Sequence, residues 1–326
     1  MSQFFSDNLP KFASVFSAIG AFFLVFAVIF AIAGRANGKK ARPIALIVFL
    51  APALLLILAG VVIPGVRTIL FSFMNPDSNG FIGLSNYQWM IEDPNVKTIM
   101  INTILWIIVV PIFTACLGLL LAIMLDRIKH ESIPKSLLFM PMAISFVGAS
   151  IIFKFVYEYN EPGEVQKVLL SAVVEFFGFT PSDWMLTKPL NTFLLMIIYV
   201  WTQMGFGMVI LSAAIKGVPS DIVEASALDG AHGWRLFRNI TFPMVKGTFT
   251  VVLATGVVGA LKVFDIVRTM TGGNFSTNVL ANEMYSQTFV QFDQGKGSAL
   301  AVVLFLLVAP ILIYNIQSLR KERANN

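Results

Sequence analysis

Long apolar runs separated by short polar segments dominate this chain. Each run is long enough to form a helix across the hydrocarbon core of a bilayer, which takes about 20 residues. Pro111, inside the third run, predicts a kink in its helix. The pattern predicts an all-α polytopic membrane protein with about seven transmembrane helices, over residues 12–33, 44–73, 98–125, 136–157, 191–215, 244–266 and 297–319.

Two of the polar loops are expected to hold amphipathic segments. Tyr87 and Trp89, in the loop 74–98, indicate an amphipathic piece that lies at the membrane interface. In the loop 158–190, apolar residues recur at helical spacing and predict one amphipathic helix. The residues that carry this spacing are Val165, Val168, Leu169, Ala172, Val173 and Phe176.

The first apolar run is interpreted as a retained span, although a cleaved signal peptide is the alternative. No basic segment precedes the run, and the basic segment 34–42 follows it as a stop-transfer tail would. The expected organisation is an extra N-terminal helix with its basic cytoplasmic loop, a second helix with an external loop, a core domain that contains a polar loop, and a cytoplasmic tail. These parts cover residues 1–43, 44–94, 95–320 (polar loop 216–243) and 321–326.

Composition supports a membrane protein. Of the 326 residues, 57% are hydrophobic and 13% are charged, and the mean hydropathy is +0.80. A soluble domain carries about 25% charged residues. The net charge of +5 is spread over short loops and does not indicate a nucleic-acid partner. The single cysteine, Cys116, can form no internal disulfide, and His130 and His232 lie too far apart in sequence to suggest metal ligands.

Charge predicts the orientation. Lys and Arg gather in the segments 34–42, 126–135, 216–243 and 320–323, while the intervening segments hold few. Under the positive-inside rule these four segments face the cytoplasm. With seven spans, the N-terminus is then outside and the C-terminus inside.

The polar segment 216–243 is punctuated as a helical hairpin. Ser220 is a good N-cap, and Asp221 and Glu224 place negative charge at the positive end of the helix dipole. Gly230 is positioned to end this first helix, because glycine accepts the left-handed conformation.

A second short helix is predicted from about Trp234 to Asn239 and is expected to stop at Pro243. The whole segment resembles the EAA loop of ABC importers, whose pattern is Glu-Ala-Ala, a later Gly, and then Ile-x-Leu-Pro. Two positions depart mildly from the pattern, Ser226 for Ala and Phe242 for Leu. The matching positions are Glu224, Ala225, Ser226, Gly230, Ile240 and Pro243.

Other tracts extend the resemblance over roughly residues 44–320. They are similar to the permease subunits of carbohydrate ABC importers, in particular the α-glucoside group (maltose, trehalose or sucrose) related to the first of the two maltose-system permeases. This family has the type I importer transmembrane fold. The tracts are 139–150, 210–219, 261–267 and 297–304.

The resemblance implies partners and a location. The polar segment is then a coupling helix that docks on an ATPase subunit, with Glu224 as the charged contact. Its docking residues are Glu224, Ala225, Ser226, Asp229, Gly230, Ile240 and Pro243. The resemblance further implies a second similar permease, two ATPase subunits that bind ATP and Mg²⁺, an external solute-binding protein and a bacterial or archaeal cell membrane. No cofactor is implied in this chain, and the resemblance leaves the sugar open.

No catalytic motif is evident in the chain. It lacks a phosphate-binding loop, a His-Glu-x-x-His pattern and a Gly-x-Ser-x-Gly pattern. A non-enzymatic subunit is therefore expected, whose energy enters through a partner. Two alternatives are a stand-alone secondary carrier or channel for a polar solute and a membrane-bound enzyme.

Charged residues inside the predicted spans need a reason, because each costs about 2.5–3.5 kcal/mol at mid-bilayer on insertion scales. Arg67, Lys154, Lys262 and Asp265 all lie nearer the expected outer ends of their helices. They either line the mouth of a polar pathway, or they snorkel to the interface, with a local contact between Lys262 and Asp265 on one helix face.

Polar and aromatic residues inside the spans are candidates for a sugar pathway, since sugars use hydroxyl and amide partners and flat aromatic faces. For the tract Tyr199–Gly207 the alternative is helix packing through Gly205 and Gly207. The pathway candidates are Asn102, Trp106, Ser145, Tyr157, Tyr199, Trp201, Gln203, Lys262 and Asp265.

Overall fold

A computed structural model describes residues 2–35, 41–126, 128–159 and 169–325. The chain forms two compact units, Met1–Arg67 and Thr68–Asn326. Parts of the sequence-based predictions fall outside the described residues: the basic residues Lys39, Lys40 and Arg127, and Val165 and Val168 of the amphipathic pattern.

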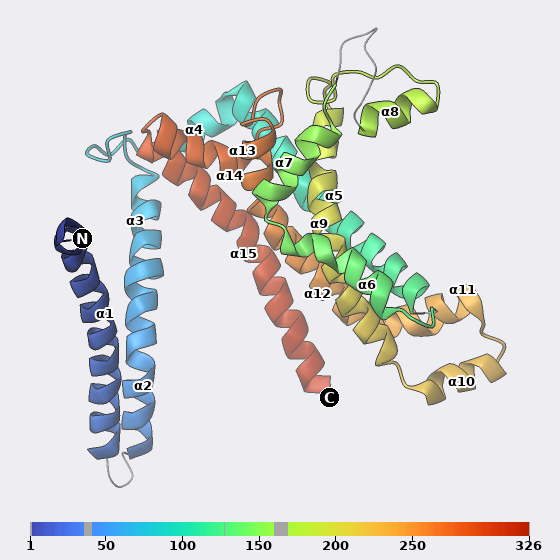
Figure 1. Cartoon of the computed structure of the whole chain (residues 1–326), viewed down its shortest axis with the longest axis horizontal. Helices are drawn as coiled ribbons and strands as arrows, with labels where there is room; N and C mark the ends of the chain where they lie inside the picture. Colours follow the sequence, from blue (N-terminus) through green and yellow to red (C-terminus); the bar gives the residue numbers. More distant parts are fainter. Residues whose placement is uncertain (1, 36–40, 127, 160–168, 326) are drawn as a thin grey trace. The chain divides into compact units, whose positions relative to one another are not determined.

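The first unit is helical (Figure 1). Helix α1 (Ser2–Arg35) packs against α2 (Ala41–Ile57), where the rings of Phe30 and Phe49 lie 5.6 Å apart. A π-turn, η2 (Leu58–Val62), continues α2 into α3 (Ile63–Phe71), which crosses the unit boundary. Most described side chains in α1 and α2 are apolar and exposed, as expected for helices that contact lipid. The apolar spans Lys11–Ile32 and Leu46–Phe71 confirm the first two predicted helices.

Three long helices form the centre of the second unit. They are α5 (Pro94–Leu125), α9 (Leu190–Lys216) and α12 (Phe242–Leu261), and each packs on the other two. Glycines permit the close contact: a Cβ on Gly118 would lie 2.9 Å from the backbone of Gly207. A Cβ on Gly205 would lie 2.3 Å from the carbonyl oxygen of Leu138. The packing role considered for Gly205 and Gly207 is therefore present.

The fourth predicted span, over residues 136–157, is broken in the middle and is not one continuous helix. The segment holds α6 (Ser132–Phe139), a 3₁₀ turn η3 (Met140–Ala143) and α7 (Phe146–Val156), with a bend of 102° between the two parts. Ile144 and Ser145 are extended, and the Ser145 hydroxyl accepts a hydrogen bond from the Gly148 amide at 3.1 Å. Ser145 thus caps a new helix inside the apolar run.

The sixth transmembrane helix, predicted over residues 244–266, begins and ends at other residues in the structure. Its N-terminal part is continuous with α11 (Gly233–Leu236) through the π-turn η4 (Phe237–Thr241), so Pro243 does not stop a helix. Pro243 lies in the first turn of α12, directly after the π-turn, where its missing N–H is tolerated. At the other end α12 stops at Leu261.

Lys262 and Asp265 therefore do not share one helix face. Lys262 caps the end of α12 and Asp265 begins α13 (Asp265–Met270), and both are exposed. The predicted local contact between them on one helix is wrong, because the chain leaves the helix between the two residues.

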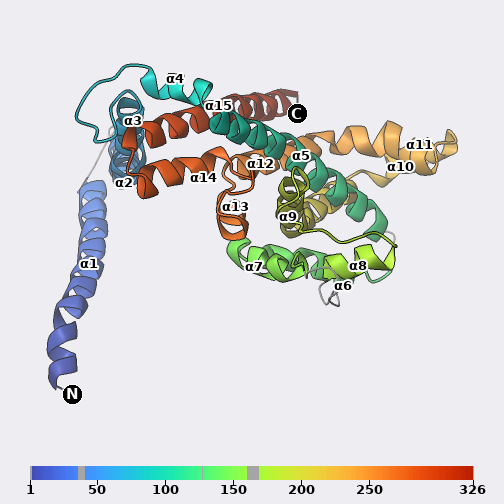
Figure 2. The ribbon, with the colours of Figure 1, turned by 90° about the horizontal axis from the view of Figure 1, so that it is seen from above.

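Shorter helices cover the end of the unit away from α10 and α11 (Figures 1 and 2). These are α4 (Ser85–Glu92), α13, α14 (Leu280–Tyr285) and the π-turn η5 (Ser286–Val290), while α8 (Leu169–Phe176) follows α7. Helix α8 confirms the helix predicted in the loop 158–190, within the residues described. In the loop 74–98, α4 contains Tyr87 and Trp89, and the predicted place of this segment at the membrane interface stays a prediction.

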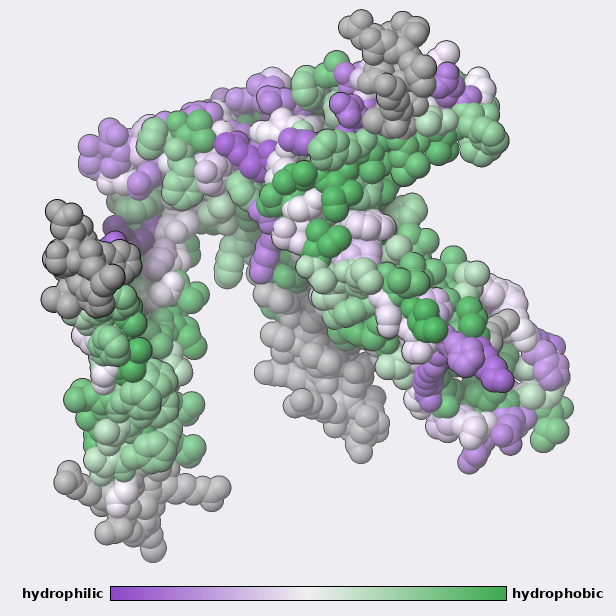
Figure 3. Space-filling view, viewed as in Figure 1, coloured by the Kyte–Doolittle hydropathy of each residue, from purple (hydrophilic) through white to green (hydrophobic). Residues whose placement is uncertain are grey.

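By length and composition, the described residues hold five helices able to cross a membrane, and up to six if the bent pair counts as one span. The remaining expected span lies in α15 (Gln294–Asn325), whose apolar part, Gln294–Pro310, is shorter. The all-α polytopic class is confirmed. Figure 3 shows hydrophilic side chains gathered at the two ends of the second unit and apolar surface between them.

Candidate functional site

Helix α10 (Ser220–Leu228) and helix α11 form a hairpin that projects from the ends of α9 and α12 (Figure 1). The N-cap residue of α10 is Pro219, with no capping bond from a side chain, so Ser220 is the first helical residue and the predicted Ser220 cap is wrong. Asp221 lies in the first turn, where its charge complements the helix dipole.

Gly230 ends α10 as predicted, with φ +80°. The Ala231 amide bonds to the Ser226 carbonyl at 2.9 Å, and the Gly230 amide bonds to the Ala227 carbonyl at 3.1 Å. These two bonds form a Schellman motif. An added Cβ on Gly230 would meet nothing within 4 Å, so backbone conformation rather than space requires glycine here.

The predicted docking residues divide into exposed and covered positions. Glu224, Ala225 and Asp229 are exposed on α10 and at its end. Ser226 is buried, and its hydroxyl donates to the Ile222 carbonyl. Ile240 and Pro243, by contrast, lie in the π-turn and in α12, on the helix that leads back into the bundle.

Sequence reasoning missed the apolar surface of the hairpin. Leu228 is 90% exposed, Trp234 is 72% exposed and Ile222 is also exposed. The signal was available, because these large apolar residues interrupt a polar segment. Such a cluster on a projecting hairpin is typical of a surface that a partner covers.

A network of charges ties the helix ends beside the hairpin. The Lys135 ammonium bonds to Asp126, to Glu131 at 2.8 Å and to the Ser212 hydroxyl, and Ser212 donates to Asp126 at 2.6 Å. Lys216, at the end of α9, forms an ion pair with Glu131. The ends of α5, α6 and α9 are thereby held together.

The same network sets the acidity of Glu131. Hydrogen bonds from Lys135 and then from Lys216 lower the pKa of its carboxyl from 4.5 to about 2. Glu131 therefore stays charged over the physiological range.

The aromatic pathway candidates lie in the protein core. Trp106, Tyr157 and Tyr199 belong to one buried apolar cluster. The ring of Tyr199 lies 6.3 Å from the ring of Trp106, and the Tyr157 hydroxyl donates to the Leu194 carbonyl at 3.0 Å. Trp201 is partly buried, with its ring 5.3 Å from that of Phe153. These contacts are packing contacts within one chain.

The remaining candidates do not converge on that cluster. Gln203 is partly buried on α9, Ser145 is exposed at the cap of α7, and Lys262 and Asp265 are exposed around the break after α12. Lys262 lines an open, largely apolar cavity of about 450 Å³ together with Phe264 and Tyr285. The pathway assignment of these residues stays a prediction.

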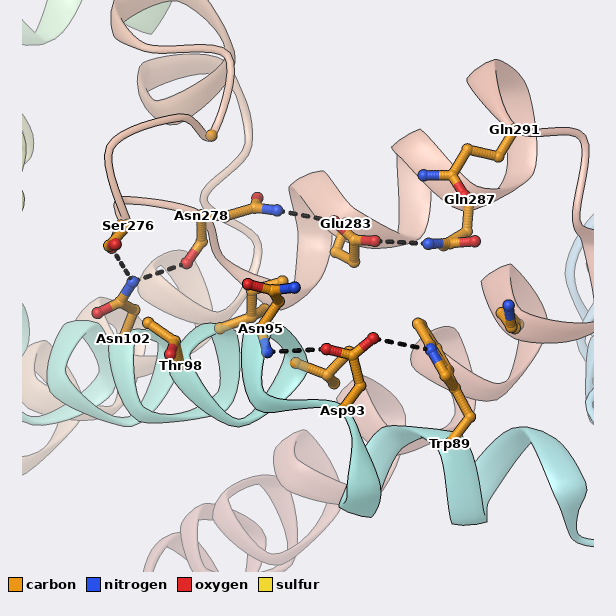
Figure 4. A pocket seen from close by; sticks show the side chains of 14 residues that line it. Trp89, Asp93, Asn95, Thr98, Asn102, Ser276, Asn278, Glu283, Gln287 and Gln291 are labelled. Atoms are coloured by element: carbon orange, nitrogen blue, oxygen red, sulfur yellow. Dashed lines mark hydrogen bonds between the residues drawn. The ribbon is translucent and has the colours of Figure 1, made fainter.

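Asn102 is the one pathway candidate in a polar cavity, of about 500 Å³ (Figure 4). Its amide nitrogen donates to the carbonyls of Ser276 at 2.6 Å and Asn278 at 3.0 Å, which anchors the loop before α14. The walls come from α4, α5, α14, η5 and the start of α15. The polar residues that line the cavity include Asp93, Asn95, Thr98, Asn278, Glu283, Gln287, Gln291 and Lys296.

This cavity was missed from the sequence. Its residues are scattered between 89 and 296, in loops and short helices whose packing no spacing reveals. The helices α4 and α14, which contribute to its walls, lie at the end of the second unit opposite the α10–α11 hairpin (Figure 1).

Comparison with solved structures supports the fold. A bacterial ABC transporter involved in the import of the acidic polysaccharide alginate superposes with a TM-score of 0.74 at 17% identity, over 86% of this chain and 97% of that one. A bacterial alginate ABC transporter in complex with an alginate pentasaccharide-bound periplasmic protein superposes with a TM-score of 0.73 at 16% identity. The match covers 85% of this chain and 94% of that chain.

Sequence relatives are more similar. The α-glucoside transport system permease protein AglF of Rhizobium meliloti is 45% identical over 90% of this chain and 87% of its own. The osmoprotective compounds uptake permease protein GgtC of Synechocystis is 43% identical over 84% of this chain and 98% of its own. Residues 100–324 match the model of one family. The chain belongs to that family, the inner membrane components of binding-protein-dependent transport systems.

Proposed function

We propose that this chain is the membrane-spanning permease subunit of an ATP-driven importer for an α-glucoside or a similar oligosaccharide. The relative named for α-glucoside transport supports a hydroxyl-rich solute, and the relative named for uptake of osmoprotective compounds supports import. The chain supplies helices and a docking surface and holds no nucleotide itself.

The observation that carries the proposal is the exposed apolar tip of the hairpin. Leu228 and Trp234 expose most of their surface to solvent, and each is next in sequence to a charged residue, Asp229 and Arg235. Glu224 lies exposed on the same helix. A groove on a separate ATPase subunit would cover the apolar residues and pair with the carboxylate, and the neighbouring ionic network would pass the force to α5, α6 and α9.

The proposed assembly contains this chain, a second similar permease, two ATPase subunits that bind ATP and Mg²⁺, and an external solute-binding protein. The hairpin and the C-terminus face the cytoplasm, and the N-terminus faces outward. ATP closes the ATPase dimer, which draws the hairpins together and opens the helices outward; hydrolysis returns them. For this cycle the ATP-bound and ATP-free subunits must grip the hairpin with different free energies.

Glu224→Lys tests the proposal in the assembled complex. The variant is expected to insert and fold normally, because Glu224 is exposed, and to lose sugar-stimulated ATP hydrolysis. Glu175→Lys, the same charge reversal at an exposed position of α8, is the matched control and is expected to keep most of the activity. Full sugar-stimulated hydrolysis in Glu224→Lys would contradict the assignment. Uptake driven by a proton gradient in vesicles without ATP would instead favour a secondary carrier.

A further inference from the structure

The polar cavity at the end opposite the hairpin has hydrogen-bond acceptors left over and its buried donors already used. We propose that it receives a lysine or arginine side chain from the external solute-binding protein when that protein docks. The inference rests on the proposed function, because that function places this end of the molecule outside the membrane.

Glu283 is a carboxylate in the cavity wall whose hydrogen-bond partners are neutral. Its two carboxylate oxygens accept hydrogen bonds from the amide nitrogens of Asn278 at 2.7 Å and Gln287 at 2.6 Å (Figure 4). Both donors are neutral, and no ion pair to Glu283 occurs among the residues that the structure describes. A half-buried carboxylate that lacks a cation is an attractive site for one.

Gln287 supplies an independent sign of a missing ligand. Because a carboxylate only accepts, the amide nitrogen of Gln287 must face Glu283, and its carbonyl oxygen must face away. This oxygen is buried and has no hydrogen-bond partner within the described part of the chain, and the residue as a whole is 4% exposed. Buried polar atoms are nearly always paired. Among the described residues, Trp106, Thr114, Asp126 and Asn282 also hold an unpaired buried side-chain atom, but none of these four lines the cavity as Gln287 does. The unpaired acceptor in the cavity wall therefore favours a donor that arrives from outside.

The buried side-chain donors in the floor of the cavity are already engaged, whereas Asn95, Ser276 and Gln291 lie exposed at its rim. The Trp89 indole donates to Asp93 at 3.2 Å, and the Asn102 amide holds two backbone carbonyls. Lys296, the cation in the wall, lies 3.5 Å from Asp293 and 4.7 Å from the centre of the Trp89 ring. The floor of the cavity therefore offers hydrogen-bond acceptors. Ammonium and guanidinium groups match it, because they donate hydrogen bonds and accept none.

The source of the cation follows from the shape and place of the cavity. Small-molecule sites are enclosed and mostly apolar, whereas this cavity has mainly polar walls and an exposed rim at Asn95, Thr98 and Gln291. A sugar would use donors as well as acceptors, and the buried floor offers it acceptors alone. A metal ion is a poor fit, because the described residues contain no group of three or more potential metal-binding side chains. A basic side chain on a docking protein meets all these conditions.

The test measures binding of the purified, sugar-loaded solute-binding protein to the full transporter in nanodiscs. Glu283→Gln and Gln287→Leu are each expected to weaken this binding at least about tenfold, and Glu283→Gln is expected to reduce its dependence on salt. Glu92→Gln removes the same charge from an exposed position of α4 outside the cavity and is expected to leave the affinity unchanged. ATP hydrolysis without the binding protein should be the same in all variants.

Crosslinking gives a readout that does not depend on a buried substitution. A photo-reactive amino acid in place of Gln291, on the exposed rim, is expected to capture the binding protein at a segment with a basic residue. Equal affinity and salt dependence in wild type and both cavity variants would overturn the inference, as would quenching of Trp89 by free sugar with docking unaffected. If the wild-type complex binds no solute-binding protein at all, the proposed function itself fails.

Discussion

Replacing Leu228 by alanine tests the hairpin surface by removing apolar area without disturbing the fold. The side chain is 90% exposed at the end of α10, so little native packing is lost. We expect the free energy of unfolding to change by less than about 0.5 kcal/mol, as is usual for exposed positions.

The effect on docking should be much larger. If a partner subunit covers Leu228, the substitution removes about three buried carbon groups at about 0.8 kcal/mol each, or about 2 kcal/mol. The dissociation constant of the ATPase subunit should then rise about 30-fold, since 1.4 kcal/mol corresponds to a factor of ten.

The assay is biolayer interferometry of the ATPase subunit on the permease pair in nanodiscs. Phe176→Ala is the control, because Phe176 is 85% exposed on α8, at the other end of the same unit (Figure 1). The Phe176→Ala permease should bind the ATPase subunit with the same affinity as wild type. If Leu228→Ala binds the ATPase subunit as tightly as wild type, the hairpin surface is not the docking surface.

Three further predictions concern the scaffold. Gly205→Ala should destabilise the protein by about 1–3 kcal/mol and lower its thermal midpoint, because the added Cβ would lie 2.3 Å from the backbone of Leu138. The control is Gly20→Ala, which should not lower the midpoint, because its Cβ would meet nothing within 4 Å. Gly230→Ala should cost about 1 kcal/mol locally, because φ is +80°, and should speed amide hydrogen exchange at residues 226–231 while Gly230→Asn is milder. The lowered pKa of Glu131 means that its stabilising contribution is complete above pH 4.5 and is lost as the pH falls towards about 2; Glu131→Gln should reduce the difference between thermal midpoints measured at about pH 5 and about pH 2.5. Equal midpoints for Gly205→Ala and wild type, unchanged exchange in Gly230→Ala, or an unchanged pH difference in Glu131→Gln would each contradict the corresponding argument.

The sequence predicted the membrane class and the main helices well, because about 20 apolar residues in a row have few other stable environments. It also predicted the hairpin, since Gly230 and the polar composition are local signals. The Schellman bonds around Gly230 confirm the reading of that residue.

The breaks inside apolar runs could not be predicted in the same way. The bend between α6 and α7 and the end of α12 at Leu261 occur within segments that hydropathy treats as continuous. Local conformation decides them: Ser145 caps a new helix, and the π-turn at 237–241 lets a helix pass Pro243. Hydropathy averages over such features.

The polar cavity was hidden for another reason. Asn102, Glu283 and Gln287 come from segments almost 200 residues apart, and only packing brings them together. The aromatic residues predicted for a sugar pathway have the residue type that sugar sites use, yet Trp106, Tyr157 and Tyr199 lie in the core of this chain. Amino-acid type alone does not separate a binding surface from a packed one.

The central claim is that the α10–α11 hairpin is the surface through which a separate ATPase subunit moves these helices. The most direct measurement is thiol labelling of Leu228→Cys in a Cys116→Ala background, in membranes with and without the ATPase subunit. We expect labelling from the cytoplasmic side only, and strong protection once the ATPase subunit is bound. Labelling from the exterior, or equal labelling with and without the ATPase subunit, would contradict it.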